Sequence, residues 1–137
     1  MSTFVPSDTS RRYILVADED PTIVAFIVHT LREDNYAVFH ALDGLSAVQL
    51  AYALRRCDLV ITDTRVNGMT GTDLVRQLRR DRPELAILYI ANIGRSSPEI
   101  EQHLPPDVTI LREPFTTSEL RAAVRKLMTE SQPSPRR

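Results

Sequence analysis

The chain has 137 residues, of which 17 are basic and 18 acidic, giving a formal net charge of -1. This length fits one ordinary domain, and the balanced charge does not favour a nucleic-acid or membrane-surface protein. No apolar stretch approaches the roughly 20 residues that a membrane-spanning helix needs. The single Cys57 excludes an intramolecular disulfide, and the first ten residues lack the apolar core of a signal peptide. We therefore expect a soluble, cytoplasmic protein.

Composition also suggests where the domain begins and ends. Residues 1–12 are polar with a proline, and residues 130–137 are rich in proline and serine with a basic end. Such segments bury too little apolar surface to fold, so we expect both to be flexible tails. The predicted domain is therefore residues 13–129.

Within that domain, short apolar runs alternate with helical patterns. The runs have the length and the β-branched or aromatic character of strands. The predicted strands are residues 13–17, 36–40, 58–62, 86–91 and 108–111. The predicted helices are residues 21–33, 44–56, 71–81, 97–104 and 117–128.

Five repeats of strand and helix indicate an α/β fold, in which helices cover both faces of a parallel sheet. A closed barrel of eight such units would need about 250 residues, so an open doubly wound (βα)5 sheet is expected. The flavodoxin-like strand order 2-1-3-4-5 places the first and third strands side by side. In such sheets the functional site lies beyond the carboxyl ends of the strands.

Carboxylates follow two of these strands. Asp18 and Glu19 come after the first strand, and Asp63 follows the third. Gathered in one crevice, they would repel one another unless a cation sat among them, and Mg²⁺ prefers carboxylate oxygens. Solvated loop carboxylates are the alternative for Asp18 and Glu19. Asp20, which precedes Pro21, is expected to cap a helix.

Three motifs in order, "ILVADEDP", "DLVITDTRVNGMTG" and "ILREPF", resemble the receiver domain of bacterial two-component response regulators. The resemblance spans about residues 13–129. It implies that Asp63 accepts a phosphoryl group, as a nucleophile, from the phosphohistidine of a sensor kinase or phosphotransfer protein. It also implies that Asp18, Glu19, Asp63 and the backbone carbonyl of Arg65 bind Mg²⁺, and that the bond before Pro114 is cis.

The chain departs from the family pattern at the switch positions. Receivers normally end the fourth strand with Thr or Ser, and this chain has Ala91. Where the family has a lysine that pairs with the phosphoryl oxygens, this chain has Glu113, and an aromatic switch position holds Ile110. If Glu113 faces the crevice, it favours a divalent cation and opposes a phosphoryl group. It could instead turn to water or pair with an arginine.

Another cation could replace the missing lysine. Lys126, the only lysine, is expected far from the crevice, and strand alternation should turn Arg112 to the opposite face from Glu113. Arg65 and Arg95 lie in loops near the site and are the better candidates, although loop arginines are usually solvated.

Two functions from different classes remain open. The first is a stand-alone response regulator in a phosphorelay, phosphorylated at Asp63 and acting through a downstream protein target. The second is a pseudo-receiver that binds proteins without using phosphate. "ILVADEDPT" also matches the motif of haloacid-dehalogenase-like phosphatases, with Asp18 as nucleophile and Asp20 as general acid. Ala91 and the lack of a well-placed lysine argue against that enzyme.

The helix at 21–33 carries more apolar residues than one stripe facing a sheet requires. The resemblance implies that this helix docks on the kinase, and extra core contact is the alternative. Lysine at Val24 and Val28 would distinguish the two. A homodimer through the fourth and fifth helices is also compatible with the resemblance.

Overall fold

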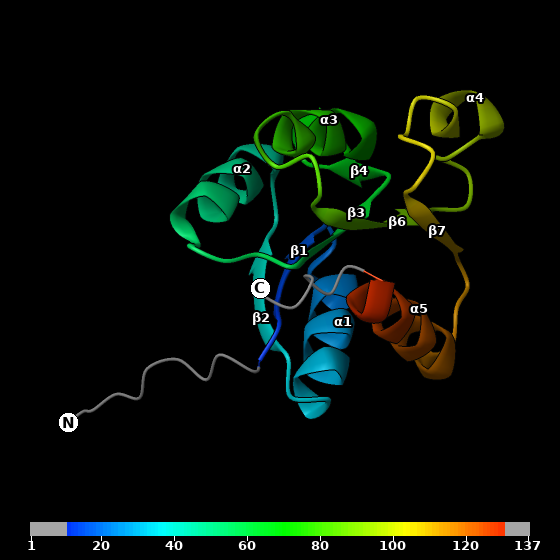
Figure 1. The fold of residues 1–137 in the computed structure, drawn as a ribbon. Coiled ribbons are helices and arrows are strands. Elements are labelled where there is room, and N and C mark those ends of the chain that lie inside the picture. Colours follow the sequence, from blue (N-terminus) through cyan, green and yellow to red (C-terminus); the bar gives the residue numbers. More distant parts are fainter. Residues whose placement is uncertain (1–10, 131–137) are drawn as a thin grey trace.

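The computed structural model describes residues 11–130 and contains a five-stranded parallel sheet with helices on both faces (Figure 1). The strand order is β2-β1-β3-β6-β7, which is the predicted order 2-1-3-4-5 of the main strands. The main strands are β1 (Tyr13–Ala17), β2 (Ala37–Ala41), β3 (Leu59–Asp63), β6 (Ala86–Ala91) and β7 (Thr109–Arg112). The predicted doubly wound α/β fold is confirmed.

Five helices connect and cover the strands. They are α1 (Pro21–Glu33), α2 (Gly44–Ala53), α3 (Gly71–Asp81), α4 (Pro98–Glu101) and α5 (Thr117–Glu130). In Figure 1, α1 and α5 lie on one side of the sheet, and α2 and α3 lie on the other. None of the helices within residues 11–130 is long and apolar enough to cross a bilayer.

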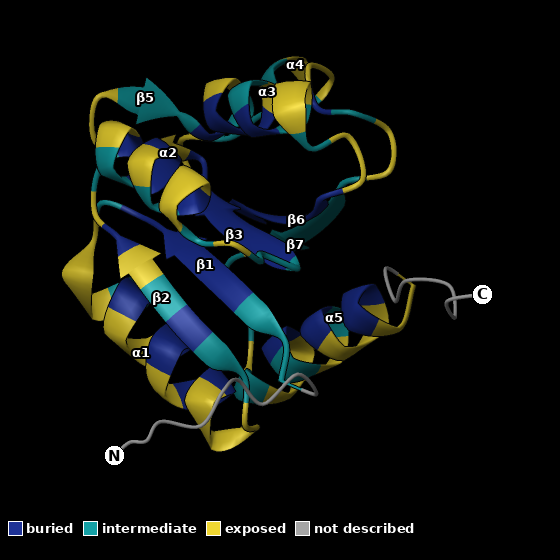
Figure 2. Ribbon diagram, turned by 60° about the vertical axis from the view of Figure 1, so that its left-hand side comes forward, coloured by how far each residue is buried: buried dark blue, intermediate teal, exposed yellow. Residues whose placement is uncertain are grey.

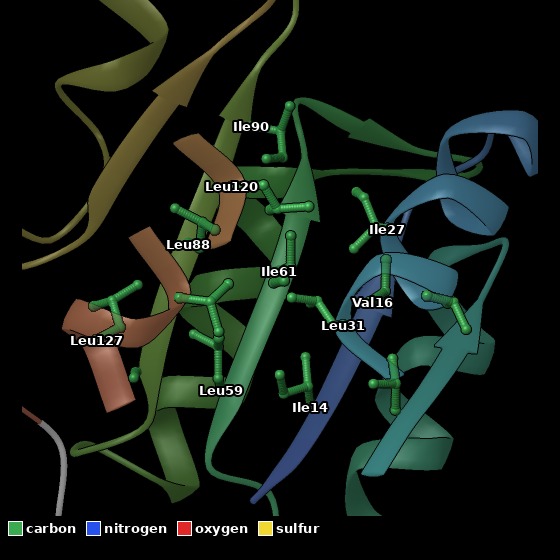
Figure 3. Packing of buried hydrophobic residues seen from close by; sticks show 14 of the residues in the cluster. Ile14, Val16, Ile27, Leu31, Leu59, Ile61, Leu88, Ile90, Leu120 and Leu127 are labelled. Atoms are coloured by element: carbon green, nitrogen blue, oxygen red, sulfur yellow. The ribbon is translucent and has the colours of Figure 1, made fainter. Parts of the chain in front are cut away.

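Alternate strand residues feed two separate cores. Ile14, Val16, Ile61, Leu88 and their neighbours pack against α1 and α5, as Figure 3 shows. The intervening residues, Leu15, Val60, Ile87 and Tyr89 among them, pack against α2 and α3. Figure 2 shows the consequence: the central strands are buried, and each helix is buried on its inner side only. A two-sided core of this kind explains why the strands are almost uniformly apolar.

Helix α2 is shorter than predicted, because it ends at Ala53 and not at residue 56. Leu54 is already extended, and Arg82 donates from one guanidinium nitrogen to the carbonyls of Ala51 and Leu54. These carbonyls lie in the last turn of the helix, where they have no intrahelical partner. A side chain distant in sequence therefore fixes this helix end.

A small hairpin that was not predicted follows β3. Its strands β4 (Arg65–Val66) and β5 (Met69–Thr70) are antiparallel and join through Asn67 and Gly68. Gly68 has a φ of 85°, a conformation that glycine adopts readily in a tight turn. The hairpin carries the chain from β3 to Gly71 at the start of α3.

The predicted tails lie almost wholly outside the described residues. Of residues 1–12 only the last two are described, and Arg11 donates to the carbonyls of Asn35 and Tyr36. Arg12 forms an ion pair with Asp58 at 3.8 Å. The bond between Glu113 and Pro114 is cis, as the resemblance implied.

Helix α3 begins directly beneath the end of β3. A Cβ added at Gly71 would collide with the backbone carbonyl of Asp63 and would come within 3.1 Å of the Tyr89 ring. The Gly71 amide also donates to the Thr64 carbonyl at 2.8 Å. Only glycine therefore allows α3 to approach the strand so closely.

Gly71→Ala should lower the free energy of unfolding by about 2 kcal/mol or more, because a backbone atom cannot move aside as a side chain can. Urea denaturation measures the change. Arg80→Ala, at an exposed position of the same helix, is the control and should change stability by no more than about 0.5 kcal/mol. Equal effects of the two substitutions would show that this close approach is not a constraint.

Candidate functional site

The carboxyl ends of β1, β3, β6 and β7 surround one small acidic cavity. Its volume is about 120 Å³. The lining residues are Asp18, Glu19, Asp20, Ile23, Asp63, Asn92, Arg95 and Glu113. The acidic side chains predicted after the first and third strands therefore share a cavity, and Glu113 joins them.

Asp18 and Asp63 are almost fully buried, with 2% and 4% of their surfaces exposed. The Asp20 amide donates to Asp18 Oδ1 at 2.9 Å, which fixes the first carboxylate. Asp63 Oδ1 is buried and has no hydrogen-bond partner within residues 11–130. An unpaired buried oxygen is unfavourable, so this atom calls for a partner from outside the chain.

Burial also raises the pKa values of these carboxyls. The pKa of Asp18 rises to about 7, mainly through burial and further through the charges of Asp63, Asp20 and Glu113. The pKa of Asp63 rises to about 6, mainly through burial, with the Glu113 charge adding to it and the Arg95 charge acting against it. The cavity therefore resists holding all its negative charges at once.

Glu113, the residue in place of the family's lysine, faces the cavity. Its pKa is raised by burial and by the charge of Asp20. Within the described residues its carboxylate has no ion pair or hydrogen bond, so the alternative of pairing with an arginine does not hold. Arg112, next to it, is on the opposite face, where it binds both oxygens of Glu101 at 2.6 and 2.9 Å, as strand alternation predicted.

The candidate replacement cations differ in position. Arg95 lines the cavity and donates to Glu19 Oε2 at 2.9 Å. Arg65 is exposed in β4 and does not line the cavity. Lys126 lies on α5 in a hollow formed with Ala122 and Arg125, far along the chain from the site. The expectation that Lys126 lies outside the crevice is confirmed.

Ala91 and Ile110, the other two altered switch residues, lie among apolar side chains. Ala91 is buried at the end of β6, and Ile110 is half-buried on β7, paired in register with Tyr89. Both belong to the core that faces α2 and α3. Ala91 cannot supply the hydroxyl, and Ile110 cannot supply the aromatic ring, that the family normally has at these positions.

Four polar side chains, from Tyr89 to Arg112, form a row of hydrogen bonds that we did not predict from the sequence. The Tyr89 hydroxyl lies 3.2 Å from Ser96 Oγ, which donates to Glu101 Oε2 at 2.6 Å. Glu101 in turn binds Arg112. The sequence contained a signal for this contact, because Tyr89 carries the one hydroxyl in the apolar run of residues 86–91. A buried hydroxyl needs a hydrogen-bond partner.

A second hydroxyl that was missed is that of Thr64, the residue after Asp63. Its Oγ1 donates to the Ile90 carbonyl and accepts from the Asn92 amide, both at 3.0 Å. These bonds fix the loop after β6 to the end of β3. Asp20 caps α1 as predicted, because Asp20 Oδ1 accepts from the Thr22 amide at 2.9 Å.

The donor set suits a hard cation, because carboxylate oxygens dominate the lining and one of them is buried without a partner. Nevertheless, no group of three or more acidic, His or Cys side chains in residues 11–130 is already arranged as a metal site. Glu19 is turned toward Arg95. Mg²⁺ commonly uses only one or two carboxylates and keeps several waters, so the residues present fit it without a complete protein cage.

Comparison with known proteins identifies the family. The family model for the response regulator receiver domain matches residues 14–125. The chain belongs to this family. It is therefore a receiver of two-component signal transduction, and "ILVADEDPT" belongs to a receiver and not to a haloacid-dehalogenase-like phosphatase.

Among curated relatives, the receiver is 30% identical over 128 residues to the DNA-binding response regulator MtrA of Mycolicibacterium smegmatis, covering 93% of this chain and 55% of that protein. It is 27% identical to the response regulator receiver protein CpdR of Brucella abortus, covering 84% of this chain and 95% of that one. The chain thus spans about half the length of MtrA and almost all of CpdR.

A solved response regulator receiver protein from Sinorhizobium medicae has the same fold. It superposes with a TM-score of 0.81 at 26% identity, covering 91% of this chain and all of the other. The likeness establishes the family fold over the whole described domain.

Asp63→Asn should stabilise the protein in the absence of divalent cations. The folded state holds protons on Asp18 and Asp63 more tightly than the unfolded chain, because their pKa values are raised to about 7 and about 6. Their stabilising contribution is therefore complete below about pH 4 and is lost as pH rises through about 6 to 7.

At about pH 8 the variant should unfold with a free energy on the order of 1–2 kcal/mol higher than wild type, after allowance for solvent screening, and near pH 4 the difference should vanish. Urea denaturation in EDTA at both pH values measures this. Asp73→Asn, an exposed carboxylate on α3, is the control and should show no such pH-dependent gain. A constant difference across the pH range would contradict the assignment.

Proposed function

We propose that this receiver accepts a phosphoryl group on Asp63 in a phosphorelay. The single observation that carries the proposal is the placement of Asp63, which lines a cavity of oxygen ligands and whose buried Oδ1 has no hydrogen-bond partner in residues 11–130. An Asp63 oxygen attacks the phosphorus of a phosphohistidine, the P–N bond breaks, and the imidazole nitrogen keeps the electron pair and takes up a proton. Positioning and charge neutralisation supply most of the catalysis in such transfers.

Asp18, Glu19, Asp63 and the backbone carbonyl of Arg65 would hold Mg²⁺, which would neutralise charge as the phosphoryl group arrives. The chain's own residues contribute placement. The hydrogen bond from the Asp20 amide orients Asp18. Thr64 fixes the end of β3 to the neighbouring strand, so Asp63 is held at a defined position in the cavity. The fit of Asp63 at that edge supports its assignment as phosphoacceptor.

The second candidate, a pseudo-receiver that binds partners without phosphate, rests on Glu113. A carboxylate that faces the cavity without a partner opposes an incoming phosphoryl dianion. Loss of one charged hydrogen bond disfavours the phosphorylated state by about 1.5–3 kcal/mol, and the repulsion adds to this. Slow phosphorylation is expected under the first function and none under the second.

Incubation with Mg²⁺ and a small phosphodonor such as acetyl phosphate should add the mass of one phosphoryl group, measured on the intact protein. Asp63→Asn should abolish the gain, and Glu113→Lys should increase the phosphorylated fraction about tenfold or more, since it replaces a repulsion by a charged hydrogen bond. No gain in either wild type or Glu113→Lys would favour the pseudo-receiver, and a gain that survives Asp63→Asn would exclude Asp63 as acceptor.

Docking of a kinase on α1 is also proposed, with a corrected choice of residues. Val24 and Val28 are only 4% and 8% exposed, because they pack in the core beneath α1. Lysine at those positions would disrupt the fold, and most of the helix's apolar excess is core contact. The exposed apolar residues are Ala25 and Phe26, and the Phe26 ring lies 6.2 Å from that of Phe115.

Ala25→Lys should therefore weaken phosphotransfer from a kinase that phosphorylates the wild type, while acetyl phosphate still phosphorylates the variant at the wild-type rate. An ammonium that an interface buries without a partner is unfavourable, so the affinity should fall about tenfold or more. Gln49→Lys, at a position of α2 that is also exposed, is the control. If both variants behave alike, α1 is not the docking surface.

A homodimer through α4 and α5 and a downstream protein target remain predictions. Helix α4 spans four residues, and its Glu101 is already bound to Arg112. That pairing removes one carboxylate from the surface on which a second copy would pack.

A further inference from the structure

One positive charge faces five negative charges in the acidic cavity. Of the residues that line it, Asp18, Glu19, Asp20, Asp63 and Glu113 are acidic, and Arg95 is basic. The Arg95 hydrogen bond to Glu19 raises the pKa of Arg95, and the charges of Asp63 and Asp18 raise it further. Its guanidinium charge therefore acts on the whole cavity as well as on its direct partner.

The loop that carries Arg95 is anchored at its base. The Asn92 amide donates to Thr64 Oγ1, and the amides of Arg95 and Ser96 donate to the Asn92 carbonyl at 3.1 and 3.0 Å. Gly94, with a φ of 86°, completes the turn. The backbone of Arg95 is thus fixed to the residue beside Asp63, while its side chain remains 44% exposed at the mouth of the cavity.

No other cation in the described chain is placed to act here. Arg112 is bound to Glu101 on the opposite face, and Lys126 is on α5 outside the cavity. Arg65 is exposed and is not part of the lining. A guanidinium also suits a phosphoryl group, because its planar fork can donate two parallel hydrogen bonds to the oxygens.

We propose that Arg95 is the cation that contacts the phosphoryl group in this receiver. It replaces the family's lysine, whose position Glu113 occupies, and Glu19 binds it until the phosphoryl group arrives. The inference rests on the proposed function, because it assumes that Asp63 is the acceptor. In the first state Arg95 lies against Glu19 and competes with a divalent cation for that carboxylate. In the second state Arg95 binds the phosphoryl oxygens and leaves Glu19 to the metal.

Because Arg95 exchanges partners, its removal should raise the affinity for Mg²⁺ and lower the affinity for a phosphoryl group. Arg95→Gln removes the competitor of Mg²⁺, so Mg²⁺ should bind about two- to fivefold more tightly, the range expected for an exposed ion pair. The same substitution removes a charged hydrogen bond to the phosphoryl group, so beryllofluoride, a phosphoryl mimic, should bind about tenfold more weakly or worse at saturating Mg²⁺. A residue with a merely structural role would shift both affinities in the same direction.

Isothermal titration calorimetry on the full chain measures both affinities, with Mg²⁺ alone and then with beryllofluoride in excess Mg²⁺. Arg80→Gln is the matched control, because it removes an exposed arginine on α3 that does not line the cavity, and it should change neither affinity by more than about twofold. Adding Glu113→Lys to Arg95→Gln should restore beryllofluoride binding, since it returns a cation to the cavity. Thermal unfolding verifies that each variant is folded.

The inference is overturned if Arg95→Gln leaves both affinities at the wild-type values, or weakens both. If wild type binds Mg²⁺ but no beryllofluoride, while Glu113→Lys binds both, the proposed function of the natural chain fails and so does the phosphoryl contact of Arg95. If wild type does bind beryllofluoride and Arg95→Gln binds it equally well, the proposed function stands and only the inference about Arg95 is lost.

Discussion

Negative charges lie close together at the carboxyl edge of the sheet, and the arrangement of the functional site follows from their repulsion. Asp18 and Asp63 end neighbouring strands, and both are buried. Their repulsion is unfavourable on its own and is offset by the two apolar cores on which the strands lie. The cores therefore maintain a pocket whose charges are satisfied only when a positive partner is present.

Glu113 and Arg95 together redistribute charge around that pocket. The family's lysine position has become acidic, and an arginine from the neighbouring loop reaches the cavity instead. The site remains acidic, because five carboxylates face the single guanidinium of Arg95. Binding of a divalent cation is favoured by this arrangement, whereas binding of a dianion depends on how completely Arg95 can be released from Glu19.

Sequence alone predicted the strand order, the shared acidic cavity and the Asp20 cap, because apolar periodicity and strand ends fix them locally. The end of α2 was wrong, since Arg82, which caps it, comes from a distant segment. The hairpin at residues 65–70 was not predicted, because its two strands are too short to show the alternation of apolar and polar residues that indicates a strand. The direction of the Glu113 side chain was left open because both faces at a strand end offer it water, and only the packed cavity decides.

The row of hydrogen-bonded side chains from Tyr89 to Arg112 has a consequence for the loop between β6 and α4. Arg95 is tied to the first strand's loop through Glu19, whereas Ser96, its neighbour, is tied to Glu101 and so to the last strand. Two adjacent residues are thus bonded to elements on opposite sides of β6, the loop after β1 on one side and β7 on the other. A change of partner at Arg95 would therefore take place one residue away from the hydrogen bond that links this loop to Glu101 and, through it, to β7.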